Sequence, residues 1–277
     1  MDRYAVIGNP VAHSKSPQIH AAFAAQTGQR MQYEALLAPL DGFRATVDAF
    51  RRDGGRGLNV TVPFKLEAHA LADTLSPRAE AAGAVNTLRF DNEGVLGDNT
   101  DGAGLVRDLL HNLGHPLGGT RVLLLGAGGA ARGAVLPLLD ERPARLVIAN
   151  RTVARATELS DRFAPRAVAT ELTGCGFADL AGQQFDLVIN ATASSLSDEA
   201  PALPAGVYAE HALAYDMMYG RGDTAFMAAA RAAGAARLAD GLGMLVEQAA
   251  ESFLLWRGVR PATAPVLAAL RTQVLAG

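Results

Sequence analysis

The chain has 277 residues, of which 19% are charged and 49% hydrophobic, and its formal net charge is −3. At about 150 residues per domain this length predicts two domains, and the charge excludes the strongly basic surface that binds nucleic acid or anionic membranes. The single cysteine, Cys175, excludes an intrachain disulfide framework and a multi-cysteine metal site. Because no apolar run reaches about 18 residues and the start MDRYAVIGNP lacks the features of a signal peptide, we expect a soluble, cytoplasmic protein.

The first hundred residues alternate strand and helix patterns. The expected elements are a strand at 4–8, a helix from Ser16, a strand at 32–37, a helix at 43–52, a strand at 58–62, a helix opened by Pro63, and a hairpin of residues 86–90 and 95–97. The turn of this hairpin, Asp-Asn-Glu-Gly at 91–94, has the composition of a tight connection. This alternation predicts a domain built on a mixed α/β sheet.

A second series of elements follows a helix that begins near Asp101. Its strands are expected at 121–125, 146–149, 185–190 and 211–216. Short apolar strands that alternate with helical segments imply right-handed crossovers and a parallel sheet. The alanine-rich segment 228–236 is expected to be helical, and residues 242–256 form a helix with an apolar stripe.

Residues 121–132 predict a strand, a glycine turn and a helix. From Gly126 to Ala131 the sequence fits the pattern G-x-G-x-x-A. The first glycine permits a tight turn, the second lets a pyrophosphate approach the backbone, and the N-terminus of the following helix attracts its charge. This context predicts a dinucleotide site at Gly126, Ala127, Gly128, Gly129 and Ala130, the alternative being a glycine turn without a ligand.

The next strand ends at Asn150, Arg151 and Thr152, and Arg155 lies one helical turn further on. An acidic residue at this strand end is typical of NAD enzymes, whereas a nearby arginine accommodates the 2′-phosphate of NADP. The acidic residue is absent here, and two guanidinium groups can bind a phosphate through charge-assisted hydrogen bonds. We therefore predict NADP, the alternative for the arginines being a solvated helix face.

Only two lysines, Lys15 and Lys65, accompany 23 arginines in the chain, and lysine, unlike arginine, can exchange a proton in proteins. Ser14 and Ser16 flank Lys15 just before a helix, where two hydroxyls and a cation suit a carboxylate. The alternative for Ser16 is a simple helix cap.

A second polar group surrounds the other lysine. Asn59 and Thr61 lie on one face of a predicted strand, and Lys65 follows just beyond its end. Asn86 begins another predicted strand. Asp101 lies at a helix start, where its alternative role is to accept hydrogen bonds from backbone N–H groups.

These residues lie in motifs that resemble those of the shikimate dehydrogenase family. In the family's order the motifs are GNPVAHSKSP from Gly8, NVTVPFK from Asn59, GAVNT from Gly83, GDNTDG from Gly97, GAGGA from Gly126, NRT from Asn150, YDMMY from Tyr215 and DGLGM from Asp240. The resemblance implies an NADP-dependent dehydrogenase that reversibly reduces 3-dehydroshikimate to shikimate, in the biosynthesis of chorismate and the aromatic amino acids. It also implies two α/β domains separated by a cleft: a mixed-sheet substrate domain at 1–101, completed by helices at 241–277, and a Rossmann-like NADP domain at 102–240.

The resemblance also implies a role for each matching residue. The carboxylate would be held by Ser14, Ser16 and Tyr219; the ring by Asn59, Thr61, Asn86 and Gln248; the reacting oxygen by Lys65 and Asp101; and the nicotinamide would lie near Met217 and Gly241. Gln248 owes its role to the resemblance alone, since by itself it would be an exposed helix residue.

These residue types fit the chemistry of ketone reduction. Hydride transfer to a ketone carbon leaves an alkoxide that needs a proton, and the reverse reaction needs a base. Lys65 can supply or accept that proton while Asp101 holds the ammonium and the hydroxyl. The positive end of the helix at Lys65 favours the neutral amine and the Asp101 carboxylate favours the charged one, so the sequence leaves the protonation state of Lys65 open. The nicotinamide performs the redox step, so no metal is expected, and the six histidines show no metal-ligand spacing.

One departure from the family pattern follows Thr192, where the family often has a glycine near Ser195; the sequence leaves its effect on cofactor affinity open. Other interpretations are a quinate/shikimate dehydrogenase with relaxed cofactor use, a dehydrogenase linked to tetrahydrofolate or glutamyl-tRNA, and a non-catalytic NADP-sensing paralogue. The paired arginines Arg151 and Arg155 argue against relaxed cofactor use, and the N-terminal motifs argue against the tetrahydrofolate- or glutamyl-tRNA-linked enzymes. The presence of Lys65 and Asp101 argues against a non-catalytic paralogue. The expected partner is a small-molecule substrate, without nucleic acid or membrane, and the expected assembly is a monomer or homodimer.

Overall fold

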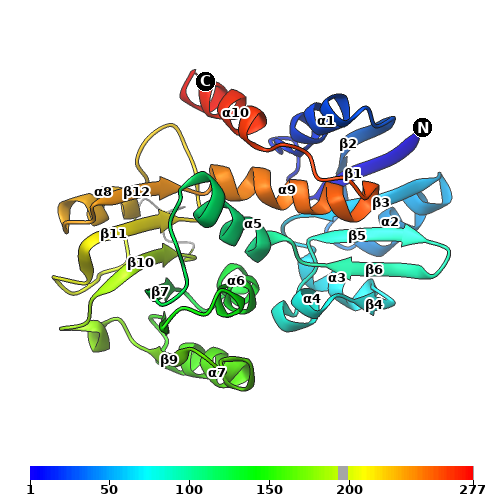
Figure 1. Ribbon diagram of the computed structural model, residues 1–277. Coiled ribbons are helices and arrows are strands. Elements are labelled where there is room, and N and C mark those ends of the chain that lie inside the picture. Colours follow the sequence, from blue (N-terminus) through cyan, green and yellow to red (C-terminus); the bar gives the residue numbers. More distant parts are fainter. Residues whose placement is uncertain (193–198, 277) are drawn as a thin grey trace. The chain divides into compact units, whose positions relative to one another are not determined.

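The computed structural model describes residues 1–192 and 199–276 (Figure 1). The chain divides into two compact units, of which the first comprises Met1–Gly104 with Leu245–Ala268 and the second Leu105–Met244 with Ala269–Gly277. The division therefore groups the end of the chain with the second unit, whereas the sequence assigned all of 241–277 to the first.

The first unit is built on a six-stranded sheet with the order β2-β1-β3-β5-β6-β4. Its strands are β1 (Asp2–Gly8), β2 (Met31–Leu37), β3 (Gly55–Val60), β4 (Thr74–Leu75), β5 (Thr87–Asp91) and β6 (Gly94–Asp98). Strand β1 runs parallel to β2 and β3, while β5 runs antiparallel to β3 and β6. The sheet is thus mixed, which confirms the prediction from sequence.

Helices cover both faces of this sheet. They are α1 (Ser16–Thr27), α2 (Phe43–Arg52), α3 (Lys65–Leu71), α4 (Pro77–Ala82), α9 (Leu242–Arg257) from Leu245 onward, and the first residues of α10 (Ala264–Ala276). On one face α2, α3 and α4 pack onto the sheet around Ile7 and Leu58. Phe43 of α2 stacks on Phe64, just before α3, with ring centroids 5.0 Å apart.

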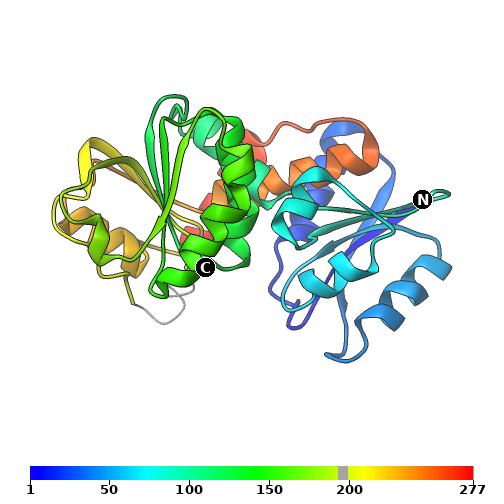
Figure 2. The same ribbon diagram turned by 90° about the horizontal axis from the view of Figure 1, so that it is seen from below.

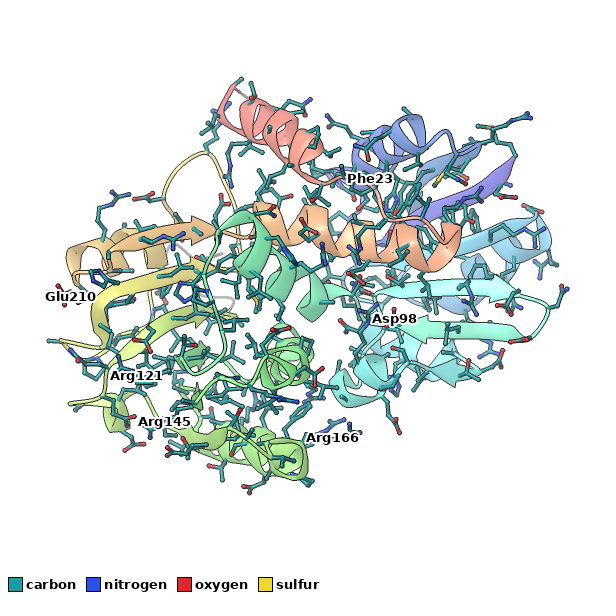
Figure 3. All side chains as sticks on the ribbon, viewed as in Figure 1. Phe23, Asp98, Arg121, Arg145, Arg166 and Glu210 are labelled. Atoms are coloured by element: carbon teal, nitrogen blue, oxygen red, sulfur yellow. The ribbon has the colours of Figure 1, made fainter. Side chains whose placement is uncertain are left out.

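The opposite face is covered by α1 and α9. Tyr4 of β1 stacks on Trp256 of α9 with centroids 4.7 Å apart. Phe23 of α1, labelled in Figure 3, meets Phe253 of α9 edge-on at 5.7 Å. Because successive side chains of a strand point to opposite faces, Asn59 in β3 lies on this α1/α9 face while Leu58 lies on the other.

The second unit holds a parallel six-stranded sheet with the order β12-β11-β10-β7-β8-β9. Its strands are β7 (Arg121–Leu125), β8 (Arg145–Ala149), β9 (Glu171–Cys175), β10 (Phe185–Asn190), β11 (Tyr208–Asp216) and β12 (Arg237–Asp240). In chain order within the unit this is 6-5-4-1-2-3, the strand order of the dinucleotide-binding Rossmann fold. The predicted Rossmann-like architecture is confirmed.

The helices of the second unit lie on both sides of its sheet. Helices α6 (Gly129–Asp140) and α7 (Val153–Phe163) cover one face and α8 (Ala225–Ala232) the other (Figure 2). Helix α5 (Asp101–Arg107) spans the division between the units and continues as a π-helical turn, Asp108–Asn112; short 3₁₀ turns lie at Ala164–Arg166 and Ala178–Leu180. Within the described residues, no helix is long and apolar enough to cross a membrane.

The structure corrects several predicted boundaries. The alanine-rich helix ends at Ala232 rather than Ala236, because Gly234 adopts a left-handed conformation with φ of 92° and the chain then enters β12. Helix α3 begins at Lys65 rather than Pro63, since the preceding residues form a turn in which the Phe64 N–H donates to the Thr61 carbonyl at 3.0 Å.

Candidate active site and dinucleotide site

The first unit brings the predicted proton-transfer residues together. Lys65 is the first residue of α3 and Asp101 the first residue of α5. The Lys65 Nζ lies 2.5 Å from Asp101 Oδ2, and the two side chains are 34% and 19% exposed. The amine is therefore oriented by a carboxylate and still accessible to a ligand.

Asn86 holds the other oxygen of that carboxylate. Its Nδ2 donates to Asp101 Oδ1 at 2.8 Å and to Thr100 Oγ1 at 2.9 Å, while its Oδ1 accepts from the Thr100 N–H at 2.9 Å. Gln248 Oε1, from α9, lies 3.5 Å from the same Asn86 nitrogen. Asn86, Gln248, Asp101 and Lys65 thus form one polar cluster.

Asn59 is hydrogen-bonded within the first unit, and the role toward the substrate ring that the resemblance implies stays a prediction. Its side chain is buried, its Oδ1 accepts from the Tyr33 hydroxyl at 2.7 Å, and its Nδ2 donates to Ser252 Oγ at 2.8 Å and Thr87 Oγ1 at 3.1 Å. Both amide hydrogens are therefore engaged within the protein. We interpret Asn59 as part of the framework of the site; Tyr33, Thr87 and Ser252 carried no signal in the sequence because each is an ordinary strand or helix residue.

Thr61 and the two serines also lie in the first unit. Thr61 follows β3 and is partly exposed, and a Cβ at Gly8 would lie 2.4 Å from its Cγ2, so the first glycine of the N-terminal motif leaves room for it. Ser14 Oγ accepts from the backbone N–H of Ser16, where α1 begins, at 3.2 Å. The N-cap position of α1 is Lys15 and has no side-chain cap hydrogen bond, so neither serine is the N-cap residue.

A buried ion pair supports the segment that leads to Asp101. Asp98, labelled in Figure 3 at the end of β6, accepts from Arg78 Nη2 at 2.6 Å and from Ser76 Oγ at 2.5 Å. Burial raises the pKa of the Asp98 carboxyl, but the hydrogen bonds and charge of Arg78 outweigh this and hold it below the usual value. Asp98 stands in the motif GDNTDG, whereas Arg78 is brought to it by the fold.

In the second unit the glycine loop leaves α6 open at its N-terminus. Gly126 has φ of 105°, and a Cβ there would lie 3.1 Å from the Ala191 carbonyl oxygen. At Gly128 and Gly129 no described atom lies within 4 Å of the position a Cβ would take. The loop thus offers exposed backbone beside a helix N-terminus, as a pyrophosphate requires.

A cavity of about 340 Å³ lies beside this loop. Its lining comprises Ala127, Gly128, Arg132, Arg155, Glu158, Leu159 and Arg162. Three guanidinium groups against one carboxylate suit a doubly charged phosphate. The Nε of Arg132 is buried and has no hydrogen-bond partner among the described residues, so a ligand oxygen could satisfy it.

The structure thus adds to the arginines expected from the sequence. Arg155 lines the cavity, as do Arg132 and Arg162, which the sequence analysis did not single out. A signal was present: Arg132 follows the glycine loop directly, and Arg162 lies two helical turns after Arg155 on the same face of α7. Arg151 is exposed and is not among the described lining residues, and Asn150 donates to the Thr152 carbonyl at 3.0 Å.

The remaining predicted residues of the second unit follow β11 and β12. A Cβ at Gly241 would lie 2.1 Å from the Met217 carbonyl oxygen, and the Gly241 N–H donates to the Met218 carbonyl at 2.9 Å. Only glycine allows this approach of the two strand ends. Burial and the charge of Asp240 raise the pKa of Tyr219, which is half-buried; its role toward a carboxylate stays a prediction, and Ser195 lies outside the described residues.

Comparison with known proteins gives the same family along most of the chain. Family models match residues 6–88 (Shikimate dehydrogenase substrate binding domain), 108–197 (Shikimate / quinate 5-dehydrogenase) and 241–271 (Shikimate 5′-dehydrogenase C-terminal domain). The chain is 69% identical over 277 residues to the shikimate dehydrogenase (NADP(+)) of Aromatoleum aromaticum, covering 100% of this chain and 99% of that protein.

Solved structures agree with this comparison. An Ael1 enzyme from Pseudomonas putida is similar with a TM-score of 0.92 and 50% identity, covering 98% of both chains. The shikimate 5-dehydrogenase from Thermus thermophilus, solved in complex with NADP(H) and shikimate, is similar with a TM-score of 0.85 and 35% identity, covering 98% of this chain and 99% of that one.

Proposed function

The chain belongs to the shikimate dehydrogenase family, and we propose that it catalyses the NADPH-dependent, reversible reduction of 3-dehydroshikimate to shikimate. The observation that carries this proposal is the Lys65–Asp101 pair, 2.5 Å apart, with Asn86 on the second carboxylate oxygen. The pair can deliver a proton to an oxygen and take it back, as a ketone–alcohol interconversion requires.

The described residues of the second unit fit NADP. The open backbone at Gly128 and Gly129 would accept the pyrophosphate, and Arg132, Arg155 and Arg162 would surround the 2′-phosphate in their cavity. The bound nicotinamide would supply or accept the hydride. The absence of an acidic residue at the end of β8, where Asn150 stands, removes the group that would favour NAD.

In the first unit each residue has a distinct task. The Lys65 ammonium gives a proton from Nζ to the substrate oxygen that becomes the hydroxyl, and in the reverse direction the amine accepts it. Asp101 orients Nζ through Oδ2 and accepts a hydrogen bond from the substrate hydroxyl, without taking its proton. Ser14 and Ser16, at the start of α1, would bind the carboxylate. We also infer that the enzyme is cytoplasmic and monomeric or homodimeric. Its net charge of −3 supports the inference that it has no nucleic-acid partner.

Two substitutions of Lys65 test the proton-transfer role. Lys65→Ala is expected to lower kcat by about 10²- to 10⁴-fold, the usual contribution of general acid–base catalysis. Lys65→Arg is expected to be equally impaired, because guanidinium keeps the charge but does not release a proton near neutral pH. Steady-state reduction of NADP by shikimate, with folding checked by circular dichroism, gives both values.

The other lysine provides the matched control. Lys15→Arg makes the same chemical change at a residue outside the Lys65–Asp101 cluster and is expected to leave kcat nearly unchanged. If Lys65→Arg restored most of the rate, Lys65 would act through its charge alone and the proton-transfer role would be wrong.

A further inference from the structure

A chain of hydrogen bonds, buried in its middle and partly buried at both ends, leads from Tyr33, in β2, toward Asp101. The Tyr33 hydroxyl donates to Asn59 Oδ1 at 2.7 Å, and Asn59 Nδ2 donates to Thr87 Oγ1 at 3.1 Å. The Thr87 hydroxyl then donates to Asn86 Oδ1 at 2.9 Å, and Asn86 Nδ2 donates to Asp101 Oδ1 at 2.8 Å. All five residues belong to the first unit.

Every link of this chain has the same polarity. A hydroxyl has a single hydrogen to donate, and an amide presents its oxygen and its nitrogen on opposite sides. Because Tyr33 donates to the oxygen of Asn59, the Asn59 nitrogen is turned toward Thr87, whose single hydrogen is directed in this chain to Asn86 Oδ1 and has Ser252 Oγ at 2.9 Å as its alternative acceptor. Hydrogen bonds arranged head to tail polarise one another in a buried environment, and this series ends on the carboxylate that holds Lys65.

The phenol at the head of the chain is held by aromatic packing. The imidazole of His20, which is fully buried, stacks on the Tyr33 ring with centroids 4.2 Å apart and an interplanar angle of 9°. The Trp256 ring of α9 packs against the same two rings, with its centroid 6.3 Å from that of Tyr33. Burial lowers the pKa of His20 to about 3, so the stacked ring is neutral at working pH.

Tyr33 also reaches the start of α1. Burial raises the pKa of Tyr33 well above its usual value, and a hydrogen bond with Ser16 opposes this. Ser16 is one of the two serines proposed to bind the substrate carboxylate. The carboxylate receptor proposed at the start of α1 and the chain of donors that ends on Asp101 therefore belong to the same unit.

We propose that Tyr33 is a positioning residue for the reaction, whose hydroxyl fixes the orientation of the Asn59 amide and, through Thr87 and Asn86, of the Asp101 carboxylate. This inference rests on the proposed function, because it assigns Tyr33 to the proton-transfer pair of that reaction. Without the hydroxyl, the Asn59 oxygen loses its donor, and the amide is held only through its nitrogen by Thr87 and Ser252. Asn86 keeps its bond from the Thr100 N–H, so the expected effect on Asp101 is a partial loss of orientation.

The test compares two tyrosine-to-phenylalanine variants in the same sheet. Tyr33→Phe is expected to lower kcat about 5- to 30-fold, which corresponds to about 1–2 kcal/mol of lost positioning in the transition state, with the KM for NADP unchanged. Tyr4→Phe is the matched control, because Tyr4 stacks on the same Trp256 at 4.7 Å but its hydroxyl meets Arg257 at 3.3 Å. Tyr4→Phe is expected to keep the kcat of the unmodified protein.

A second variant separates positioning from stability. Thr87→Val removes the Thr87 hydroxyl from the middle of the chain and keeps the shape of the side chain. The double variant of Thr87→Val and Tyr33→Phe is expected to have a kcat no lower than that of the slower single variant, because both substitutions interrupt the same chain. If Tyr33→Phe does not fold, Thr87→Val alone must lower kcat while leaving the KM for NADP unchanged. A folded Tyr33→Phe or Thr87→Val variant with unchanged kcat would overturn the inference, as would equal losses in Tyr33→Phe and Tyr4→Phe.

These results are distinct from a failure of the proposed function. An unmodified protein that does not oxidise shikimate with NADP would contradict the proposed function itself. Where that activity is present, the comparison of Tyr33→Phe, Thr87→Val and Tyr4→Phe bears only on the positioning role.

Discussion

Replacing His20 with phenylalanine is predicted to make the protein less sensitive to acid. His20 is fully buried, and burial lowers its pKa more than the neighbouring Asn59 side chain raises it. Its neighbours are aromatic: Tyr33, Phe23, Phe253 and Trp256. A phenylalanine ring can occupy such a site without a group that titrates.

The size of the effect follows from the pKa of His20. Burial lowers this pKa from 6.5 to about 3, so between these values the unfolded chain binds a proton that the folded chain does not. Stability is therefore unaffected by His20 above about pH 6.5 and falls as the pH decreases toward 3. At about pH 5 the loss is 1.5 pH units times 1.36 kcal/mol, or about 2 kcal/mol.

Urea unfolding at about pH 7.5 and about pH 5 measures this difference. Between the two pH values the unmodified protein should lose about 2 kcal/mol more free energy of unfolding than His20→Phe does. The pKa of His115 is also lowered, by burial and by Arg237, but His115 is present in both proteins and cancels in the comparison. An equal loss in the two proteins would refute the reasoning, because His20 would then not be buried in its neutral form.

Three further predictions concern the two units. Arg155→Ala should raise the KM for NADP about 10- to 150-fold, because a charged hydrogen bond is lost, and leave the KM for NAD nearly unchanged. The control is Arg166→Ala, which should change neither KM, since Arg166 (labelled in Figure 3) is exposed and outside the cavity lining. Equal effects on both cofactors would contradict a 2′-phosphate site. Gly243→Ala should lower the free energy of unfolding by about 1–3 kcal/mol, since its Cβ would lie 1.9 Å from Asp108 Oδ1; an unchanged urea midpoint would show that this contact relaxes freely. Ser14→Ala should raise the KM for shikimate and not that for NADP, and shikimate methyl ester should be a poor substrate; rapid turnover of the ester would exclude a carboxylate receptor.

The sequence predicted the parts of the fold that local patterns encode. Central strands such as 121–125 and 185–190 are mostly apolar because helices cover them on both faces, and both strands have these bounds in the structure. Strands β9 and β12 were missed because they lie at the edges of the second sheet, where residues such as Glu171 and Arg237 remain exposed. The end of the helix in the alanine-rich segment 228–236 was predicted wrongly, because alanine favours a helix but does not mark where it ends; Gly234 marks the end.

The candidate site was predictable where chemistry follows one motif and not where it depends on the fold. Lys65 and Asp101 stand out in their motifs, and the structure places them 2.5 Å apart. Tyr33 meets its partners only through tertiary packing, so nothing in its sequence neighbourhood distinguishes it from a core residue, whereas Arg132 could have been found from its place directly after the glycine loop. The family resemblance could assign Asn59 to the substrate but could not reveal that its amide is already engaged within the protein.

The central claim is tested most directly by the appearance of NADPH when the purified, unmodified protein is mixed with NADP and shikimate. The same measurement is repeated with NAD in place of NADP and with quinate in place of shikimate. We predict rapid formation of NADPH with shikimate and NADP, and much lower kcat/KM for either replacement. Absence of NADPH formation would contradict the assignment, and equal efficiency with both cofactors and both substrates would instead indicate a quinate/shikimate dehydrogenase with relaxed cofactor use.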